Sequence, residues 1–153
     1  MGKRRQAELL DGALLACQWA ESVRVHREVA APFGDVPLPT IDPADIAAVA
    51  AVVLRDPSHD GAVYDLTGPE PVSPREQAAA IAAAVGEPVR FTEQTRAQAR
   101  ATLVRFMPEP VADSTLDLLS TPVRQVSPVV ADLLGRRGRT FAEWAEDNAA
   151  AFA

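Results

Sequence analysis

Apolar and polar positions along most of the chain follow a helical period. Apolar residues that recur every three to four positions predict a helix with one face packed on a core. The pattern covers three segments, residues 4–24, 43–54 and 74–85. In the first segment one face carries three small or apolar residues, Leu10, Leu14 and Cys17. Residues from 95 onward are also predicted to be helical, with breaks at Pro108, Pro110, Pro122 and Pro128.

The expected helix starts share a polar signature. A side-chain oxygen just before the first helical residue accepts a hydrogen bond from a backbone N–H that would otherwise lack a partner. Five starts fit, namely Asp42 with Pro43 and Asp45, Ser73 with Pro74 and Glu76, Thr95 with Gln98, Thr140 with Glu143, and a weaker Ser127 with Pro128. Gly86 is expected to end the second of these helices in a left-handed conformation. Capping explains the acidic and hydroxyl residues of the first two starts without a further role.

Two shorter segments alternate between apolar and polar residues with a period of two. Residues 62–68 (AVYDLTG) and 88–94 (PVRFTEQ) are therefore predicted to be strands. Helices dominate, and the strands are too few for an independent doubly wound sheet. The sequence thus predicts an α+β fold, in which residues 1–153 form one helix-rich domain with a few short strands.

Composition excludes several classes of protein. A chain that is 48% hydrophobic with a net charge of only −6 is expected to fold, and its acidic balance argues against nucleic-acid binding. No segment reaches the roughly 18 apolar residues of a membrane helix, and no apolar signal-peptide core follows the basic start, so we expect a cytoplasmic protein without membrane contact. Cys17 stands alone and the two histidines lack ligand spacing, which predicts neither a disulfide framework nor a metal site. Abundant alanine and arginine indicate a GC-rich genome, as in actinobacteria.

One short run of positive charge, GRRGR at residues 135–139, interrupts this acidic balance. Glycines separate the arginines, which favours a solvated loop over a structured site. An anion site is the alternative interpretation of this run.

Three stretches stand out by their order along the chain. They are IDPADIAAVAAVVL (41–54), YDLTGPEPVS (64–73) and RTFAEWAEDNAAAF (139–152). Together with the upstream WAESVRV and APFGD, they resemble the C-terminal part of NmrA-like proteins, which are atypical short-chain dehydrogenase/reductases that bind NAD(P). The resemblance covers nearly the whole chain. It implies a substrate-side subdomain together with the last elements of the family's sheet.

The nucleotide-binding features of that family are missing from the sequence. No G-x-G-x-x-G or G-x-x-G-x-x-G turn opens a strand–turn–helix unit, so no glycine turn cradles a pyrophosphate. The Tyr-x-x-x-Lys pair of many relatives is also absent, because Gly68 stands four positions after the only tyrosine, Tyr64. We therefore expect this chain alone to bind no cofactor and to transfer no hydride.

Two explanations fit a substrate subdomain without a nucleotide-binding half. The chain is either a natural short protein that kept the pocket, which its polar and helix-compatible start MGKRRQAELLDG favours, or an excised part of a larger reductase. An apolar face that once met the missing half needs a cover. A symmetric homodimer is the commonest solution, so we expect a homo-oligomer with its pocket near the former domain boundary.

Large side chains supply most of the candidate substrate contacts. Trp19 and Trp144 are either core residues or walls against a flat, unsaturated ligand. Phe106 and Met107 precede the break at Pro108, where they form either a plug at a helix end or an adaptable lip of the pocket.

Polar candidates for catalysis are few. Tyr64 is either a structural hydroxyl or a hydrogen-bond donor in the pocket, and His26 is either a surface residue or a general acid/base. His59 is interpreted as a turn residue. Glu109 and Asp113 follow the Pro108 break, and burial against apolar walls would raise their pKa values.

The functional hypothesis follows from this short list of catalytic groups. No Ser-His-Asp set or nucleophile elbow occurs, whereas positioning a flexible polyene for reaction requires mainly shape. We therefore expect a cofactor-independent cyclase or isomerase that binds a hydrophobic small molecule. Its sharpest form is intramolecular cycloaddition of a polyketide-like substrate in bacterial specialised metabolism. The alternatives are a noncatalytic ligand-binding or regulatory module, and the C-terminal part of an NAD(P)-dependent reductase.

Overall fold

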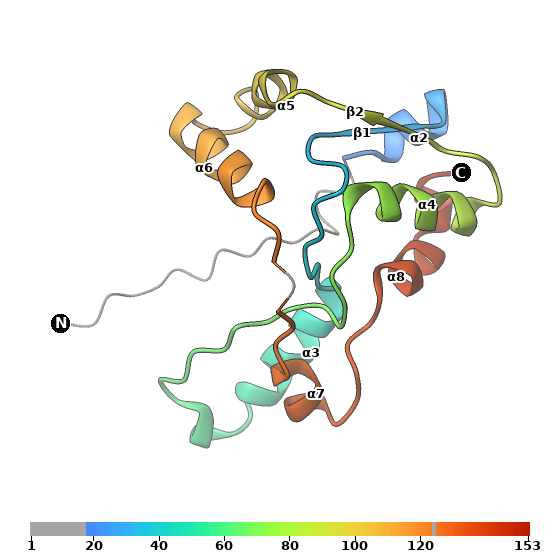
Figure 1. The fold of residues 1–153 in the computed structure, drawn as a ribbon. Coiled ribbons are helices and arrows are strands. Elements are labelled where there is room, and N and C mark those ends of the chain that lie inside the picture. The colour runs from blue at the N-terminus through green and yellow to red at the C-terminus, as the bar shows by residue number, and fades with distance from the viewer. Residues whose placement is uncertain (1–17, 124) are drawn as a thin grey trace.

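Helices dominate the computed structural model, which describes residues 18–123 and 125–153 (Figure 1). Their order with the strands is α2 (Ala20–His26), β1 (Glu28–Ala31), α3 (Pro43–Val53), α4 (Pro74–Val85), β2 (Arg90–Glu93), α5 (Arg96–Leu103), α6 (Glu109–Leu119), α7 (Val129–Leu134) and α8 (Phe141–Asp147). Two short 3-10 turns, η1 (Pro57–His59) and η2 (Ala149–Ala151), follow α3 and α8. The predicted helix-rich fold with few short strands is confirmed. Most of the helix predicted at 4–24, including Leu10, Leu14 and Cys17, lies outside the described residues.

The predicted caps hold the helix starts in place. At α4, Glu76 accepts a hydrogen bond from Ser73 N at 2.8 Å, and Ser73 Oγ accepts one from Glu76 N at 3.3 Å. The same reciprocal pair opens α5 and α8, and Asp42 Oδ1 accepts from Ala44 N at 2.8 Å before α3. Gly86 ends α4 with φ of 72°, in the left-handed region that favours glycine. Capping residues read from the sequence therefore place the ends of these helices correctly.

The strands form a short parallel pair. Glu28 of β1 lies opposite Arg90 of β2, and the register continues to Ala31 opposite Glu93. The strand predicted at 88–94 is thus confirmed in its central residues. The sequence reasoning missed β1, because its four residues follow α2 directly. Between α2 and β1 lies only Arg27, whose left-handed conformation with φ of 51° ends the helix and turns the chain into the strand.

The other predicted strand, at residues 62–68, is not formed. This segment is extended, but no described strand pairs with it, and the side chain of Val63 is 77% exposed. Alternation of apolar residues is not enough, because a strand also needs a neighbour that takes up its backbone hydrogen bonds. Its end is instead fixed by Gly68, whose N–H donates to Pro39 O at 3.0 Å. A Cβ at Gly68 would lie 1.9 Å from Thr40 O, so the close approach of the two backbones requires glycine.

One of the predicted proline breaks is also wrong. Pro108 precedes α6 as predicted, but Pro110 lies inside its first turn. The first N–H groups of a helix have no partner within the helix, so a proline at this position costs no hydrogen bond.

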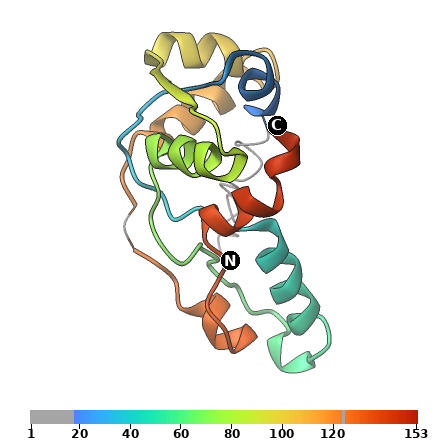
Figure 2. The same cartoon turned by 90° about the vertical axis from the view of Figure 1, so that its right-hand side faces the viewer.

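Two groups of apolar side chains form the core. The larger group joins α2, β1, α4 and α8 around five large residues, Val23, Val29, Ile81, Trp144 and Phe152. The smaller joins α3 and α7 around Ile41, Val49 and Val130. Both views show α3 against α7 at one end of the molecule and α4 against α8 near its middle, with the α5–α6 pair set apart from α8 (Figures 1 and 2).

The GRRGR run is a loop that is exposed at Gly135, Arg136 and Arg137, as predicted, and all three of its arginines also pair with carboxylates. Arg136 lies 2.8 Å from Asp45, Arg137 lies 2.7 Å from Glu143, and Arg139 Nε donates to Asp42 at 2.7 Å. Arg139 also pairs with Asp147. We call these three arginines with Asp42, Asp45, Glu143 and Asp147 the arginine clasp. It joins the start of α3 to α8 and leaves no guanidinium in the run without a carboxylate partner.

Asp45 has a structural role beyond helix capping. Its side chain is completely buried and accepts a hydrogen bond from Arg139 N at 2.6 Å, 94 positions along the chain. The expectation that capping alone explains Asp45 is therefore wrong. A carboxylate in the first turn of α3 remains favourable for the helix dipole, and the same group holds the clasp loop in place.

Candidate ligand-binding cavity

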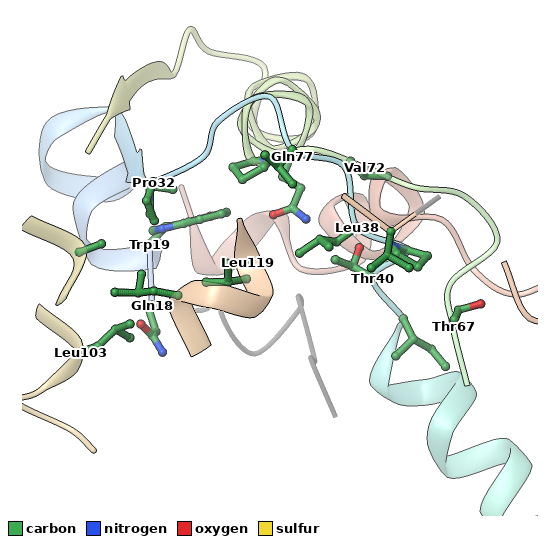
Figure 3. A pocket seen from close by; sticks show the side chains of 18 of the residues that line it. Gln18, Trp19, Pro32, Leu38, Thr40, Thr67, Val72, Gln77, Leu103 and Leu119 are labelled. Atoms are coloured by element: carbon green, nitrogen blue, oxygen red, sulfur yellow. The ribbon is translucent and has the colours of Figure 1, made fainter. Parts of the chain in front are cut away.

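A cavity of about 670 Å³ lies on the side of β1 and α4 that faces the α5–α6 pair. This volume is within the range typical of pockets for small molecules. Its wall is mostly aliphatic and aromatic, and it includes residues from α4, α5 and α6 and from the extended segments 30–41 and 63–67. Figure 3 shows side chains from these elements around one space.

The wall at the α5–α6 pair is fixed by ion pairs on its outer surface. Arg100 of α5 donates to Asp113 at 2.7 Å and to Glu109 at 2.9 Å, both on α6. The guanidinium of Arg100 lowers the pKa of the Asp113 carboxyl. These contacts leave the opposite faces of the two helices free to present Leu103 and Leu116 to the cavity. Asp113, predicted to gain a raised pKa in a pocket, has a lowered pKa instead, because it is paired and only half-buried.

Trp19 and Gln77 enter the cavity from different elements. Trp19 lies just before α2, and its ring extends along the wall beneath Pro32 (Figure 3). Gln77 lies in the second turn of α4 and is only 5% exposed, and its amide end points into the space between Trp19 and Leu38 (Figure 3). The two side chains place a flat aromatic face and a neutral amide in the same hollow.

Tyr64 also lines the cavity, and its hydroxyl has a fixed partner. His59 Nδ1 lies 2.5 Å from Tyr64 Oη, and the two rings meet edge to face with centroids 5.7 Å apart. Asp56 accepts from Ser58 N at 2.9 Å and caps the 3-10 turn that carries His59. His59, interpreted from the sequence as a turn residue only, therefore also orients the phenol of Tyr64.

The other sequence candidates lie elsewhere. Trp144 packs in the larger core, His26 is exposed at the end of α2, and Glu109 pairs with Arg100 on the outer surface of α6. Phe106 is 73% exposed, and Met107 accepts a weak contact from Thr115 at 3.9 Å. None of these five residues lines the cavity, whereas Trp19 and Tyr64 do.

Sequence reasoning missed Gln77 and Thr40 as cavity residues. A signal for Gln77 was present, because it stands four positions before Ile81 and so shares the buried face of α4. A polar residue on a buried helix face calls for a partner. Thr40 precedes the cap of α3 in a loop, and nothing in its local sequence sets it apart.

The described residues do not fit the pyrophosphate of a dinucleotide. Such a site needs a glycine turn that opens the N-terminus of a helix to the phosphates. The turn from β2 into α5 consists of Gln94 and Thr95, and the N-terminus of α5 is already capped by Thr95 and Gln98. After β1, no helix begins before Pro43.

Neither a metal site nor a membrane-spanning helix is present among the described residues. Residues 18–123 and 125–153 contain no group of three or more histidine, cysteine or acidic side chains placed to hold a metal ion. Within the same part of the chain, no helix has the length and apolarity needed to cross a membrane.

Comparison with known proteins identifies the origin of this fold. No protein-family model matches the chain. The chain is 40% identical over 139 residues to the NAD(P)H azoreductase of Xenophilus azovorans. It is 38% identical over 142 residues to the (4-alkanoyl-5-oxo-2,5-dihydrofuran-3-yl)methyl phosphate reductase of Streptomyces griseus. Each match takes in 88% of this chain and 49% of the relative. The chain is homologous to the C-terminal half of NmrA-like atypical short-chain dehydrogenase/reductases.

A solved structure of this NmrA-like group agrees with the assignment. The NADPH-dependent quinone oxidoreductase of Escherichia coli superposes with a TM-score of 0.68 at 25% identity, over 85% of this chain and 49% of that enzyme. The chain thus spans about half the length of the relatives that it matches. The family resemblance derived from the sequence is confirmed.

Proposed function

We propose that the chain forms the substrate-binding half of an NAD(P)H-dependent reductase and works with a nucleotide-binding half that the described residues do not provide. The observation that carries the proposal is an apolar cavity of about 670 Å³ in a chain about 40% identical to an NAD(P)H azoreductase. The proposal takes up the reductase alternative of the sequence analysis, because the similar proteins named above are reductases.

The small size of the sheet supports the proposal of a nucleotide-binding half. Parallel strands are normally buried on both faces within larger sheets, and two strands alone are marginally stable. Within the described part of the chain, β1 pairs only with β2, which leaves its other edge without a neighbour. A parallel strand from a nucleotide-binding half would extend the sheet at this edge. The same half would cover the side of the molecule next to this edge.

The proposed roles follow from the geometry of the cavity. Trp19 supplies a flat wall for an unsaturated substrate. Tyr64, oriented by His59 at 2.5 Å, supplies a hydroxyl that can donate to an oxygen or nitrogen of the substrate. His26 and Trp144, proposed from the sequence, are not part of the cavity wall and are not assigned these roles.

A chimeric enzyme tests the proposal directly. The C-terminal half of the Xenophilus azovorans azoreductase is replaced by residues 18–153 of this chain, and oxidation of NADPH is followed with quinone and azo acceptors. We expect reduction by the chimera and neither NADPH binding nor reduction by the present chain alone, measured by calorimetry and absorbance. A folded chimera that binds NADPH but reduces no acceptor contradicts the proposal. So does stoichiometric NADPH binding by the present chain.

A second function, the cofactor-free cyclase or isomerase, is favoured by one observation. The cavity is walled by residues of this chain, and the described residues do not form a pyrophosphate site, so the chain can bind a guest by itself. Purified chain is incubated with a linear polyene precursor, and products are separated by chromatography. Faster cyclisation or a changed product stereochemistry supports a cyclase. Saturable binding without turnover supports the noncatalytic module. The homodimer stays a prediction that light scattering can check.

A further inference from the structure

Two polar residues of the cavity wall make no side-chain hydrogen bond with another described residue. Gln77 is 5% exposed, and its amide end points into the cavity (Figure 3). The Oγ1 atom of Thr40 is buried and likewise has no hydrogen-bond partner among the described residues. Both residues line the cavity, Gln77 from α4 and Thr40 from the loop before α3 (Figure 3).

Such groups have an energetic cost unless something else binds them. A buried amide or hydroxyl without a partner costs about 1–3 kcal/mol relative to its hydrated state. Natural proteins pair the great majority of buried polar atoms, and exceptions often occur at functional sites. In the cavity wall this cost falls on Thr40 Oγ1, and a ligand oxygen that accepts from the Gln77 amide and bonds to the Thr40 hydroxyl would recover it.

The charge of the wall restricts the ligand further. Among the described residues that line the cavity there is no arginine, lysine or histidine, and Asp65 is the one carboxylate. A phosphate or carboxylate inside this cavity would have no cation to pair with, and Asp65 would repel it. Burial of an unpaired anion is far more costly than burial of a neutral carbonyl.

We infer that the cavity selects an uncharged, flat ligand that carries a carbonyl or hydroxyl oxygen, and that Gln77 and Thr40 determine this selectivity. The inference names the substrate class of the reductase proposed above and rests on that proposal only for the reaction. It separates this chain from its Streptomyces griseus relative, whose name specifies a phosphate ester.

Ligand binding to the chain alone tests the inference without any reduction step. Three probes of similar ring size are compared by equilibrium dialysis: dimethylnaphthoquinone, with both ring positions next to the carbonyls methylated to block thiol addition; dimethylnaphthalene, which lacks oxygen; and naphthyl phosphate. The variants are Gln77→Leu and Thr40→Val. The control is Gln125→Leu, which changes an exposed glutamine outside the cavity.

We expect the quinone to bind and naphthyl phosphate to bind at least about tenfold more weakly. Gln77→Leu should weaken quinone binding by about tenfold, which corresponds to one hydrogen bond, and leave dimethylnaphthalene binding unchanged or stronger. Thr40→Val should also weaken quinone binding. Gln125→Leu should match the parent chain with all three probes.

Two outcomes overturn the inference. One is naphthyl phosphate binding as tightly as the quinone, and the other is an unchanged ratio of quinone to hydrocarbon affinity in Gln77→Leu. Circular dichroism of each variant excludes unfolding as a cause, and Gln77→Glu serves where the leucine variant fails to fold, because its carboxylate repels the quinone oxygens. Selective quinone binding together with an inactive chimera would contradict the reductase proposal while supporting this inference.

Discussion

The two tryptophans of the chain lie in environments that differ sharply. Trp144 is 7% exposed, with its ring 5.2 Å from that of Phe141 and 6.1 Å from that of Phe152. Trp19 is half-buried and borders a hollow of about 670 Å³. From the sequence both were equally suited to a core or to a pocket wall. Trp19 also packs against the edge of the larger core, whereas Trp144 lies within it. The difference indicates that Trp144 serves stability, and that Trp19 combines a smaller contribution to stability with a place in the cavity wall.

Removal of Trp144 should have the largest effect on folding. Trp144→Ala leaves a void between the rings of Phe141 and Phe152 that the neighbouring side chains cannot fill. We therefore expect a loss of about 3–5 kcal/mol in the free energy of unfolding. Urea denaturation followed by circular dichroism measures this loss. Trp144→Phe should lose less, because it retains an aromatic ring in the same space. A loss below about 1 kcal/mol in the alanine variant would show that this region is not solidly packed.

Disruption of the arginine clasp should have the second-largest effect on folding stability. Asp45→Ala leaves the Arg139 N–H without its buried acceptor and the Arg136 guanidinium without its ion-pair partner, and we expect a loss of roughly 1–3 kcal/mol in the free energy of unfolding. Asp45→Asn is the matched control, because its side-chain oxygen can still accept from Arg139 N. The asparagine variant should therefore be more stable than the alanine variant. Equal stability of the two variants would contradict the role of this hydrogen bond.

The clasp also predicts how stability depends on pH. Hydrogen bonds from Arg137, and then from the backbone N–H of Thr140, lower the pKa of Glu143 from 4.5 to about 2. A lowered folded-state pKa stabilises the fold above pH 4.5, and this contribution disappears as the pH falls towards 2. Glu143→Gln should thus be less stable than the parent chain at pH 7, and the two unfolding curves should converge near pH 2. A difference that does not depend on pH would exclude ionisation as its cause.

Removal of Trp19 should have the smallest effect on folding. Trp19→Ala removes a half-buried ring that packs against the edge of the larger core and borders an open space, so we expect a loss of about 1 kcal/mol in the free energy of unfolding, measured by urea denaturation as for Trp144→Ala. Binding of dimethylnaphthoquinone should weaken in this variant, because the flat wall is lost. Equal destabilisation by the two tryptophan-to-alanine variants would remove the distinction between the two regions.

Local chemistry is what the sequence predicts well. The capping pairs at Ser73, Thr95 and Thr140 depend on residues only three positions apart, and all three are present. Contacts between distant segments are predicted poorly. Asp45 was assigned to a cap because its partner Arg139 is 94 positions away, and residues 62–68 were assigned to a strand because alternation does not report a missing neighbour.

The cavity shows the same division. Trp19 and Tyr64 were proposed from residue type, and both line it, whereas Phe106, Met107 and Glu109 were proposed from a proline break and lie outside it. Gln77 was detectable from its helical spacing to Ile81. Thr40 was not, because its burial depends on the backbone of Gly68, which approaches from a separate segment.

Helix α4 belongs to both regions, and this has a practical consequence. Its Ala78 and Ile81 pack in the larger core, while Gln77 of the same helix faces the cavity. A compound that binds the Gln77 amide therefore also stabilises a helix that contributes to the core, and so raises the free energy of unfolding. Occupancy should raise the melting temperature in proportion to the logarithm of compound concentration once the site is saturated. A dye-based thermal screen of a chemical library can thus find natural guests of this protein before any turnover assay exists.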